Sequence, residues 1–230
     1  MVLKTKAVLF DLVGTLVYVK DSVGTVYSTV ASSFGFDLDS YKLDNAFHLI
    51  FKSKSSPSGG NEKEKLWWKD LVFETFKTSG YDLGDKFDLV FEEIFKEFTR
   101  KSAWGIYSDV IPTFEKLKSM SIKIGLISNF DNRLEIILKE IGLVKYFDSL
   151  VYSGKIGLSK PDLGIFNYAL KELNIIAEET IYIGDDINAD YYPAQSLNIN
   201  AYLIDRNNEI NINMVKKITS LGEIVDFLVV

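Results

Sequence analysis

Four short apolar runs stand out along the chain, each bounded by polar residues or by glycine. They cover residues 7–10, 122–127, 180–183 and 201–204 and contain many β-branched side chains. A run of this length that is apolar at nearly every position is typical of a strand buried on both faces of a parallel sheet. We therefore expect these runs to form the centre of a sheet.

Apolar residues spaced three and four positions apart lie between these runs and indicate amphipathic helices. Two examples are Leu134, Ile137, Leu138 and Ile141, and Phe166, Ala169, Leu170 and Leu173. Because strands and helices alternate, the pattern predicts an α/β fold whose Rossmann-like parallel sheet is sandwiched between helices. Ligands of such sheets bind beyond the carboxyl ends of the strands, so chemically active residues are expected there.

Residues 18–104 interrupt this alternation, because they carry helical patterns and no strand-like run. The first predicted strand precedes this block and the other strands follow it. We therefore expect an all-helical cap, residues 18–104, inserted into a core that consists of residues 1–17 and 105–230. The polar segment 52–60 is predicted to be a mobile loop within the cap.

Composition and charge exclude several kinds of chemistry. The 230 residues include 26 basic and 32 acidic side chains, a net charge of −6, and no basic stripe suited to nucleic acid. Cysteine is absent and His48 is the one histidine, which excludes disulfides, thiolate chemistry and histidine metal clusters. No apolar span approaches the ~18 residues needed to cross a bilayer. We expect a soluble cytoplasmic protein, with His48 as a partly buried packing residue.

Polar residues with catalytic potential follow the predicted strands. Asp11 comes directly after the first run and before a turn with Gly14, and Ser128 and Asn129 come directly after the second run. Lys160 precedes a proline at the start of a predicted helix. Taken singly, each residue also suits a structural role as a turn former, a helix cap or a solvated lysine. Their shared position near strand ends favours a common site.

Three carboxylates, Asp185, Asp186 and Asp190, lie within six positions after the run at 180–183. Like charges repel one another, so a purely structural cluster would lower stability unless a positive group lies among them. A hard cation meets this need, and Mg²⁺ typically takes one or two carboxylates together with phosphate oxygens and water. The cluster therefore predicts a Mg²⁺ site.

The order of these motifs resembles that of the haloacid dehalogenase-like (HAD) hydrolase superfamily over essentially the whole chain. The matching segments are residues 11–16, 128–129, 160–161 and 184–190. The block inserted after the first strand is similar to the helical-cap subgroup of that superfamily. Each motif alone is loose, whereas all of them in this order and spacing are highly specific.

The resemblance implies a role for each matching residue. Asp11 would act as the nucleophile and form an aspartyl ester, which divides one difficult displacement into two easier ones. Ser128 would hydrogen-bond the transferred group, and Lys160 would offset negative charge. Thr15 and Asn129 would fix the nucleophile loop and the edge of the substrate.

The same resemblance implies how a metal would be held. The carboxylates of Asp11 and Asp185 and the main-chain carbonyl of Val13 would bind Mg²⁺, with Asp186 and Asp190 in support. The cap would exclude water and select the substrate. The expected function is that of a Mg²⁺-dependent phosphatase acting on a small phosphorylated metabolite.

Val13 departs from the pattern of typical phosphatases in this superfamily, which have a second aspartate two residues after the nucleophile. That aspartate serves as general acid and then as base, a contribution of ~10²–10⁴-fold. Without it, alkyl phosphates are expected to be poor substrates. Acyl or aryl phosphates, whose leaving groups need little protonation, would avoid the defect, and so would an acid supplied by the cap.

Two alternatives remain open from the sequence. Dehalogenases of this superfamily that act on 2-haloacids also lack the second aspartate and need no metal, but they place an arginine early in the cap, whereas the first arginine here is Arg100. The chain could instead bind a phosphorylated ligand without turnover, with Trp67 and Trp68 as an exposed aromatic pair. Helical spacing favours a cap-core role for this pair, and the retained Asp11 argues against a binding module.

Overall fold

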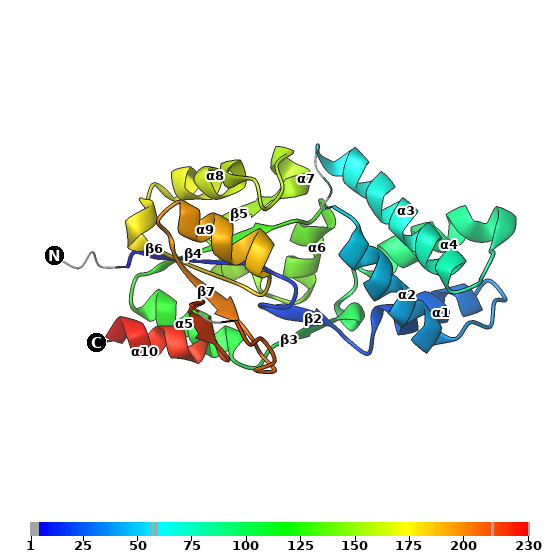
Figure 1. The fold of residues 1–230 in the computed structure, drawn as a ribbon, viewed down its shortest axis with the longest axis horizontal. Coiled ribbons are helices and arrows are strands. Elements are labelled where there is room, and N and C mark those ends of the chain that lie inside the picture. Colours follow the sequence, from blue (N-terminus) through cyan, green and yellow to red (C-terminus); the bar gives the residue numbers. More distant parts are fainter. Residues whose placement is uncertain (1–4, 56, 58, 213, 230) are drawn as a thin grey trace.

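The computed structural model describes residues 5–55, 57, 59–212 and 214–229. It is elongated, with an α/β core at one end and a helical cap at the other (Figure 1). Within the described residues, the core contains a six-stranded parallel sheet in the order β5-β4-β1-β6-β7-β8. Its strands are β1 (Ala7–Phe10), β4 (Lys123–Ser128), β5 (Ser149–Tyr152), β6 (Thr180–Gly184), β7 (Asn200–Ile204) and β8 (Lys217–Ile218).

β1 lies inside the sheet, between β4 and β6. Its last residue, Phe10, pairs with Leu126 of β4 and with Ile183 of β6. This register brings the carboxyl ends of the three strands close together, so that the residues after them enter one shared space. The arrangement confirms the predicted Rossmann-like sheet and places the ends of its strands beneath the cap.

The predicted runs correspond to β1, β4, β6 and β7, with ends that shift by at most one residue. β5 and β8, which the pattern does not predict, lie at the two edges of the sheet. β5 is a four-residue strand that begins with a serine, and β8 has two residues. β5 carries three apolar residues after its serine and β8 has two residues in all, so both are too short to give a readable pattern.

Helices cover both faces of the sheet. One face carries α5 (Val110–Ser119), α6 (Arg133–Glu140) and α10 (Gly222–Val229), and the other carries α8 (Leu163–Leu173) and α9 (Tyr192–Ser196). Val8 and Phe10 of β1 belong to the apolar cluster on the first face, and Ala7 and Leu9 to the cluster on the second. Both faces of β1 are buried, which explains its uninterrupted apolar sequence.

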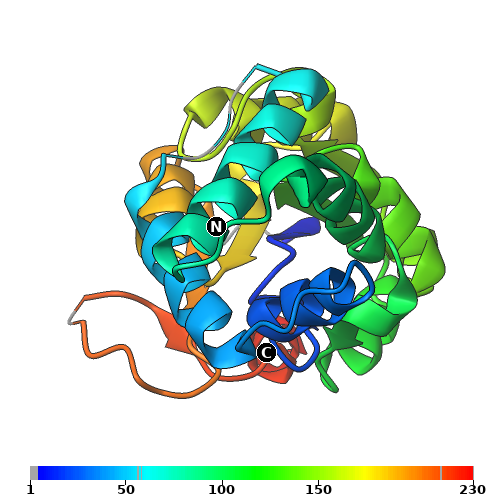
Figure 2. The same cartoon turned by 90° about the vertical axis from the view of Figure 1, so that its right-hand side faces the viewer.

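The cap is a layer of helices with an apolar core of its own. It contains α1 (Val23–Ser32), α2 (Ser40–Ser53), α3 (Asn61–Thr78) and α4 (Phe87–Glu97). Tyr27, Leu71, Phe76 and Phe91 are buried in its centre. Figure 2, viewed from the cap end, shows these helices in front of the sheet. Among the described residues, no helix combines the length and the apolar character that a membrane span requires.

Short elements complete the chain. The helix α7 (Ser153–Ile156) follows β5, and a π-helical turn, η5 (Ile187–Tyr191), follows β6. Single 3₁₀ turns are η1 (Gly84–Lys86), η2 (Lys101–Ala103), η3 (Val144–Tyr146) and η4 (Ala177–Glu179). Of these elements, η5 and α7 lie next to residues of the candidate site described below.

An antiparallel ribbon that the sequence pattern does not predict joins the cap to the core. β2 (Val17–Val19) pairs with β3 (Trp104–Ile106), and Val17 lies opposite Ile106. The predicted division, with a cap of residues 18–104, therefore cuts through both strands. Strands of three residues carry too few positions to show a period, so the sequence hides them. Between the two strands the block is helical, as expected.

The segment predicted as a mobile loop, residues 52–60, is partly outside the described residues, which omit Ser56 and Ser58. Its first two residues, Lys52 and Ser53, are the last turn of α2 rather than loop. Farther on, the N–H of Gly59 donates to the carbonyl of Gly157 over 3.2 Å. This hydrogen bond ties the end of the segment to the core.

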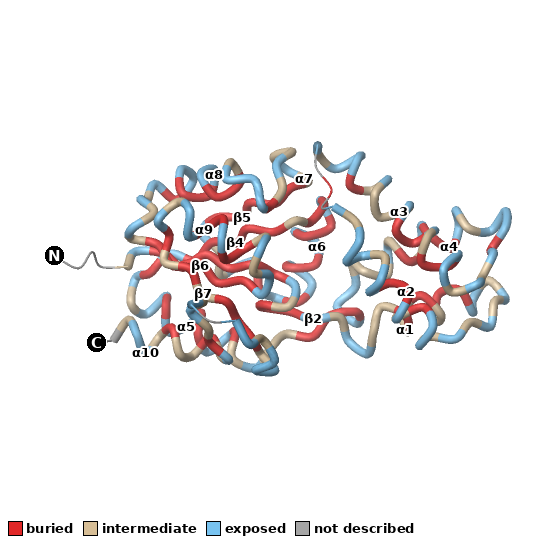
Figure 3. Tube along the Cα trace, in the orientation of Figure 1, coloured by how far each residue is buried: buried red, intermediate tan, exposed pale blue. Residues whose placement is uncertain are grey.

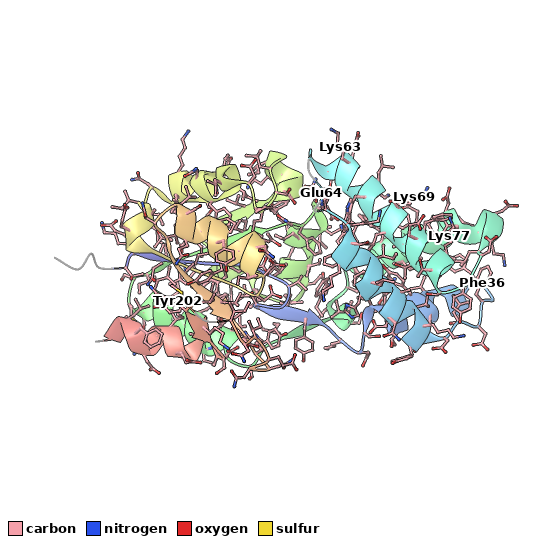
Figure 4. All side chains as sticks on the ribbon, viewed as in Figure 1. Phe36, Lys63, Glu64, Lys69, Lys77 and Tyr202 are labelled. Carbon is pink, nitrogen blue, oxygen red and sulfur yellow. The ribbon has the colours of Figure 1, made fainter. Side chains whose placement is uncertain are left out.

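The cap and the core also meet along the start of α3. The side-chain oxygen of Asn61 accepts from the main-chain N–H of Asn132 over 3.1 Å. Figure 3 shows buried chain running from the sheet toward the inner sides of the cap helices. Glu64 of α3 is fully buried at this junction, where Figure 4 labels it beside the core. Among the described residues, neither of its carboxylate oxygens has a hydrogen-bond partner.

The Glu64 carboxyl group is predicted to make stability depend on pH. Burial raises its pKa from 4.5 to about 7, so the folded protein favours the protonated form. The contribution of Glu64 to the free energy of unfolding should be most favourable below pH 4.5 and should be lost as the pH rises from there through about 7. We expect Glu64→Gln to be more stable than the wild type at pH 8, by about 2 kcal/mol after allowance for solvent screening, and nearly equal at pH 4.5.

Urea denaturation of both proteins at the two pH values tests this expectation. Glu62→Gln, an exposed substitution in the same helical turn, is the matched control and should leave the pH dependence unchanged. Equal loss of stability with pH in the wild type and in Glu64→Gln would contradict the assignment.

Candidate active site

A buried lysine links two carboxylates at the ends of the central strands. Asp11 follows β1, and its main-chain N–H donates to the carbonyl of Ile183 over 2.9 Å. Lys160 Nζ donates to Asp11 Oδ1 and to Asp190 Oδ1, each over 2.6 Å. All three side chains of this triad are at least nine-tenths buried. Residues far apart in the sequence thus form one charged group.

Asp190 is fully engaged with protein donors. Its Oδ1 accepts from the Tyr182 hydroxyl over 2.6 Å as well as from Lys160, and its Oδ2 accepts from the N–H of Asp186 over 3.1 Å. The role that this geometry suggests for Asp190 is to hold Lys160 in place. Sequence reasoning missed Tyr182; the signal was a phenol in a buried strand, where its hydroxyl requires a polar partner.

Asn129 joins the loop after β4 to the loop that carries Lys160. Its Oδ1 accepts from the main-chain N–H of Lys160 over 2.7 Å, and its Nδ2 donates to the carbonyl of Lys160 over 2.9 Å. Ser128, the last residue of β4, is buried and lines the cavity beside Asn129. The two residues therefore lie next to the triad, as the sequence predicts.

The turn after Asp11 is shaped by Gly14. Its φ of 88° suits glycine, and a Cβ added there would lie 2.1 Å from Asp185 Oδ2. Only a residue without a side chain allows Asp185 to approach the turn after Asp11 so closely. Thr15 is fully buried behind the turn and does not line the cavity, so a direct contact with substrate is not what its position suggests.

Arg206, which sequence reasoning missed, anchors the same turn from below. Its Nη2 donates to the carbonyl of Thr15, and its Nη1 donates to the carboxylate of Asp109 over 3.1 Å. The guanidinium also lies 3.6 Å from the ring centroid of Tyr107. Arg206 lies outside every motif and contacts the turn from a distant part of the chain, so no local pattern could reveal it.

The electrostatics of the site follow from burial and from the mutual proximity of the charges. Burial raises the pKa of Asp11 to about 6, although Lys160 opposes this rise. Burial disfavours the charged form of Lys160, but Asp11 and Asp190 outweigh it and raise the lysine pKa above its ordinary value. The surrounding protein limits hydration of Asp185 even though part of it faces the cavity, and with Asp11 and Asp190 this raises its pKa strongly.

The donor set fits a hard divalent cation. Asp11, Asp185 and Asp190 each offer a carboxylate oxygen, and these oxygens lie within 4.8 Å of one another. Because Asp190 already accepts from three donors, Asp11 and Asp185 are the pair best able to take a metal. Lys160 supplies one positive charge against three carboxylates, and a cation would offset the remainder.

Asp186 has a different environment from its neighbours. Its Oδ1 accepts from the N–H groups of Asn188 and Ala189, over 2.7 and 2.8 Å, and so caps the start of η5. Its own N–H supports Asp190. The structure thus brings Asp186 to the rim of the cavity as a capping residue and not into the group of clustered carboxylates.

A cavity of about 790 Å³ lies between the ends of the strands and the cap. Asp11, Ser128, Lys160 and Asp185 line its core side. Aromatic side chains dominate its cap side, among them Tyr27, Phe47, Phe51, Trp67, Trp68 and Phe95. A cavity of this size with one charged end and one apolar end is typical of a small-molecule site.

Comparison with models of protein families shows to which family the chain belongs. The model of a haloacid dehalogenase-like hydrolase matches residues 5–198. The chain belongs to the haloacid dehalogenase-like hydrolases. Among curated relatives, haloacid dehalogenase-like hydrolase domain-containing protein 3 of Danio rerio is 33% identical over 204 residues, covering 86% of this chain and 84% of that protein.

Solved structures of haloacid dehalogenase-like hydrolases include different chemistries. A HAD phosphatase from Thermococcus onnurineus is 26% identical, with a TM-score of 0.70 over 97% of this chain and 98% of its own. A 2-haloacid dehalogenase from Pseudomonas syringae pv. Tomato DC3000 is 21% identical, with a TM-score of 0.67 and 98% of each chain covered. The second likeness concerns the fold alone. Family membership therefore supports hydrolase activity. Which bond is cleaved depends on the residues of the site.

Within this haloacid dehalogenase-like hydrolase, Arg133 is the arginine that reaches the cavity, although it comes from the core helix α6. Its guanidinium makes paired contacts with Asp131, over 2.9 and 2.7 Å, and Nη1 donates to the carbonyl of Phe95 over 3.1 Å. It also lies 3.5 Å from the ring centroid of Phe95. Through its bonds to Asp131 of the core and to the Phe95 carbonyl of the cap, Arg133 joins the cap to the core.

The structure corrects one expectation about the cap of the hydrolase and extends another. His48 is not packed in a partly buried position, because its side chain is 70% exposed and lies 3.6 Å from Asp44. Trp67 and Trp68 pack against the cap core, as their helical spacing favours. They are half-buried and line the cavity, because the inner side of α3 faces the hollow as well as the cap core.

Proposed function

We propose that this hydrolase is a Mg²⁺-dependent phosphatase that uses Asp11 as its nucleophile on a small phosphorylated metabolite. The observation that carries the proposal is the buried triad, in which Lys160 orients Asp11 within a cluster of carboxylates that calls for a further cation. A phosphate group brings negative charge to this place. Mg²⁺ held by Asp11, Asp185 and the carbonyl of Val13 would supply the positive charge that makes such binding favourable.

In the first half-reaction, a carboxylate oxygen of Asp11 attacks phosphorus. A bond forms between this oxygen and phosphorus while the bond to the leaving oxygen breaks, and the leaving group takes the electron pair. Lys160 holds Oδ1, so we assign the attack to the other oxygen, which has no side-chain partner among the described residues. In the second half-reaction, water displaces the carboxylate from phosphorus and restores Asp11.

The chain's other polar residues position the reacting groups. Lys160 keeps its proton and offsets charge on the phosphate oxygens, while Asp190 and Tyr182 fix its ammonium group. Ser128 and Asn129 lie where the transferred group would be held. Arg133, which joins cap to core, helps to keep water out of the closed cavity.

The dehalogenase alternative is supported by Val13 and by a solved structure of the same fold. Two features favour phosphate. The charge of Arg133 is already paired with the buried carboxylate of Asp131, so it is not a free cation for a substrate carboxylate. Without a metal, an anionic haloacid would also face repulsion from Asp11, Asp185 and Asp190.

A release assay separates these functions. Phosphate release from p-nitrophenyl phosphate should require Mg²⁺ and stop with a chelator, and halide release from 2-chloropropionate should be absent. Titration calorimetry with Mg²⁺ alone reports the metal site without turnover. Metal-independent halide release would identify a dehalogenase. The absence of both activities and of an Asp11 adduct would identify a binding protein.

We propose that the protein works in the cytoplasm and that its binding partner is the small phosphorylated metabolite.

Val13→Asp is predicted to raise activity toward alkyl phosphates. Val13 lines the cavity with 38% of its surface exposed, so a carboxyl group there can reach the leaving oxygen. We expect kcat/KM for glycerol phosphate to rise by ~10²-fold, because a general acid is restored. Val13→Asn, which has the same size but no proton to give, is the control. Equal rates in both folded variants would show that the missing acid is not the limiting defect.

A further inference from the structure

The apolar side of the cavity is formed by aromatic rings, among them Phe51, Trp67 and Trp68. Phe51 is 47% exposed, and its ring centroid lies 6.3 Å from that of Trp68 at an interplanar angle of 24°. Trp67 stands edge-on to Trp68, with centroids 4.9 Å apart. These rings are arranged as neighbouring flat and edge surfaces, which is the environment in which a planar aromatic guest packs best.

Aromatic rings outnumber the polar side chains on the cap side, which are Asp21, Ser22, Asp44, His48, Lys52 and Lys54. Ser22 accepts the N–H of Thr25 and caps α1, and Asp44 accepts the N–H of Gly24 over 3.0 Å. Both polar side chains line the cavity but already serve the first turn of α1. A cavity of about 790 Å³ also far exceeds the need of a phosphate group. Because aromatic side chains make up most of the lining there, the unfilled part is suited to an apolar group.

The other end of the cavity makes an independent demand on the leaving group. Val13 stands where a general acid would protonate the leaving oxygen, and it offers no proton. An alkoxide is a poor leaving group without such an acid, whereas a phenoxide is stabilised by its ring and departs readily. The residues near the reacting atoms thus favour the same kind of group as the aromatic wall.

We propose that the substrates are monoaryl phosphates, with the ring held by Phe51, Trp67 and Trp68 and the phosphate at Asp11. This inference rests on the proposed phosphatase function and names its substrate class. Asp11 forms a bond to phosphorus, the bond from phosphorus to the phenolic oxygen breaks, and the phenoxide leaves with the electron pair and takes a proton from water. Water then releases phosphate from Asp11.

Matched substrates test the leaving group. Phenyl phosphate and 2-phenylethyl phosphate carry the same ring, but only the first releases a phenoxide. We expect kcat/KM for phenyl phosphate to exceed that for 2-phenylethyl phosphate by at least ~10²-fold, and 1-naphthyl phosphate to exceed both. Acetyl phosphate has a good leaving group and no ring, so its turnover reports on the proposed function alone.

Binding without turnover tests the aromatic wall. Trp67, Trp68 and Trp104 are all the tryptophans of the chain, and all line the cavity. The non-hydrolysable 1-naphthylmethyl phosphonate should therefore quench intrinsic fluorescence. Phe51→Ala, at an exposed position that tolerates truncation, should weaken this binding by about tenfold. Trp68→Leu is the second variant.

Phe73→Ala provides the matched control, because Phe73 is an exposed aromatic residue of α3 outside the cavity. It should leave both phosphonate binding and naphthyl phosphate turnover at wild-type values. Turnover of acetyl phosphate together with equal rates for the phenyl and phenylethyl esters, or phosphonate binding that neither wall variant weakens, would overturn the aryl assignment alone. Failure to turn over acetyl phosphate and every ring ester would overturn the proposed function, and this inference with it.

Discussion

Asp11→Asn is expected to lower phosphate release by at least ~10⁴-fold while leaving the fold intact. An amide cannot attack phosphorus, but it keeps the size and the hydrogen-bonding capacity of the carboxyl group beside Lys160. Initial rates with p-nitrophenyl phosphate and Mg²⁺ give the loss, and circular dichroism checks the fold. The effect should exceed that of any other substitution considered, because the nucleophile has no substitute within the triad.

Intact-mass analysis adds a readout that a structural role cannot produce. Wild-type protein exposed to acetyl phosphate and quenched in acid should gain one phosphoryl group, and the gain should be absent in Asp11→Asn. Asp88→Asn, at an exposed cap position paired with Lys69, is the control and should behave as the wild type. A phosphoryl adduct that persists in Asp11→Asn would assign the nucleophile to another residue.

Lys160→Met is predicted to have the second largest effect, on both stability and activity. The substitution keeps much of the volume but leaves Asp11 and Asp190 buried without the ammonium that each contacts over 2.6 Å. Breaking a buried ion pair in this way costs about 3–5 kcal/mol of unfolding free energy. Loss of the positive charge near the reacting group should lower kcat by ~10²–10³-fold.

The same variant should bind Mg²⁺ more tightly, because a positive charge leaves the group of carboxylates. Urea denaturation measures the stability, and calorimetry with Mg²⁺ alone measures the binding. Lys171→Met, at an exposed position on α8, is the control for loss of a lysine charge. Unchanged stability together with unchanged Mg²⁺ binding would show that Lys160 is not the link between the carboxylates.

Much of the fold could be predicted because its signals are local. The run at 7–10 is apolar at each position since both faces of β1 are covered, and this is visible without coordinates. Alternation of strands and helices then places Asp11, Ser128 and Asp185 at one edge of the sheet by topology alone. The strands of the ribbon escaped detection because each spans three residues and gives no readable period.

The rest of the site depends on contacts between distant segments. Arg133 and Arg206 act through partners far away in the sequence, which are the Phe95 carbonyl for Arg133 and the Thr15 carbonyl for Arg206. Helical spacing placed Trp68 on an apolar face but could not tell cap core from cavity wall, since both lie on the same side of α3. A buried carboxylate such as Glu64 is likewise invisible in a first helical turn rich in acidic residues.

The ribbon of β2 and β3 gives the molecule a mechanical property. The chain passes from core to cap through β2 and returns through β3, so this one pair of strands forms the covalent connection between the two parts. The ribbon begins at Val17, whose carbonyl accepts the N–H of Gly14 over 2.8 Å in the turn that follows Asp11. A movement of the cap that bends this ribbon would therefore be transmitted to the turn that follows Asp11.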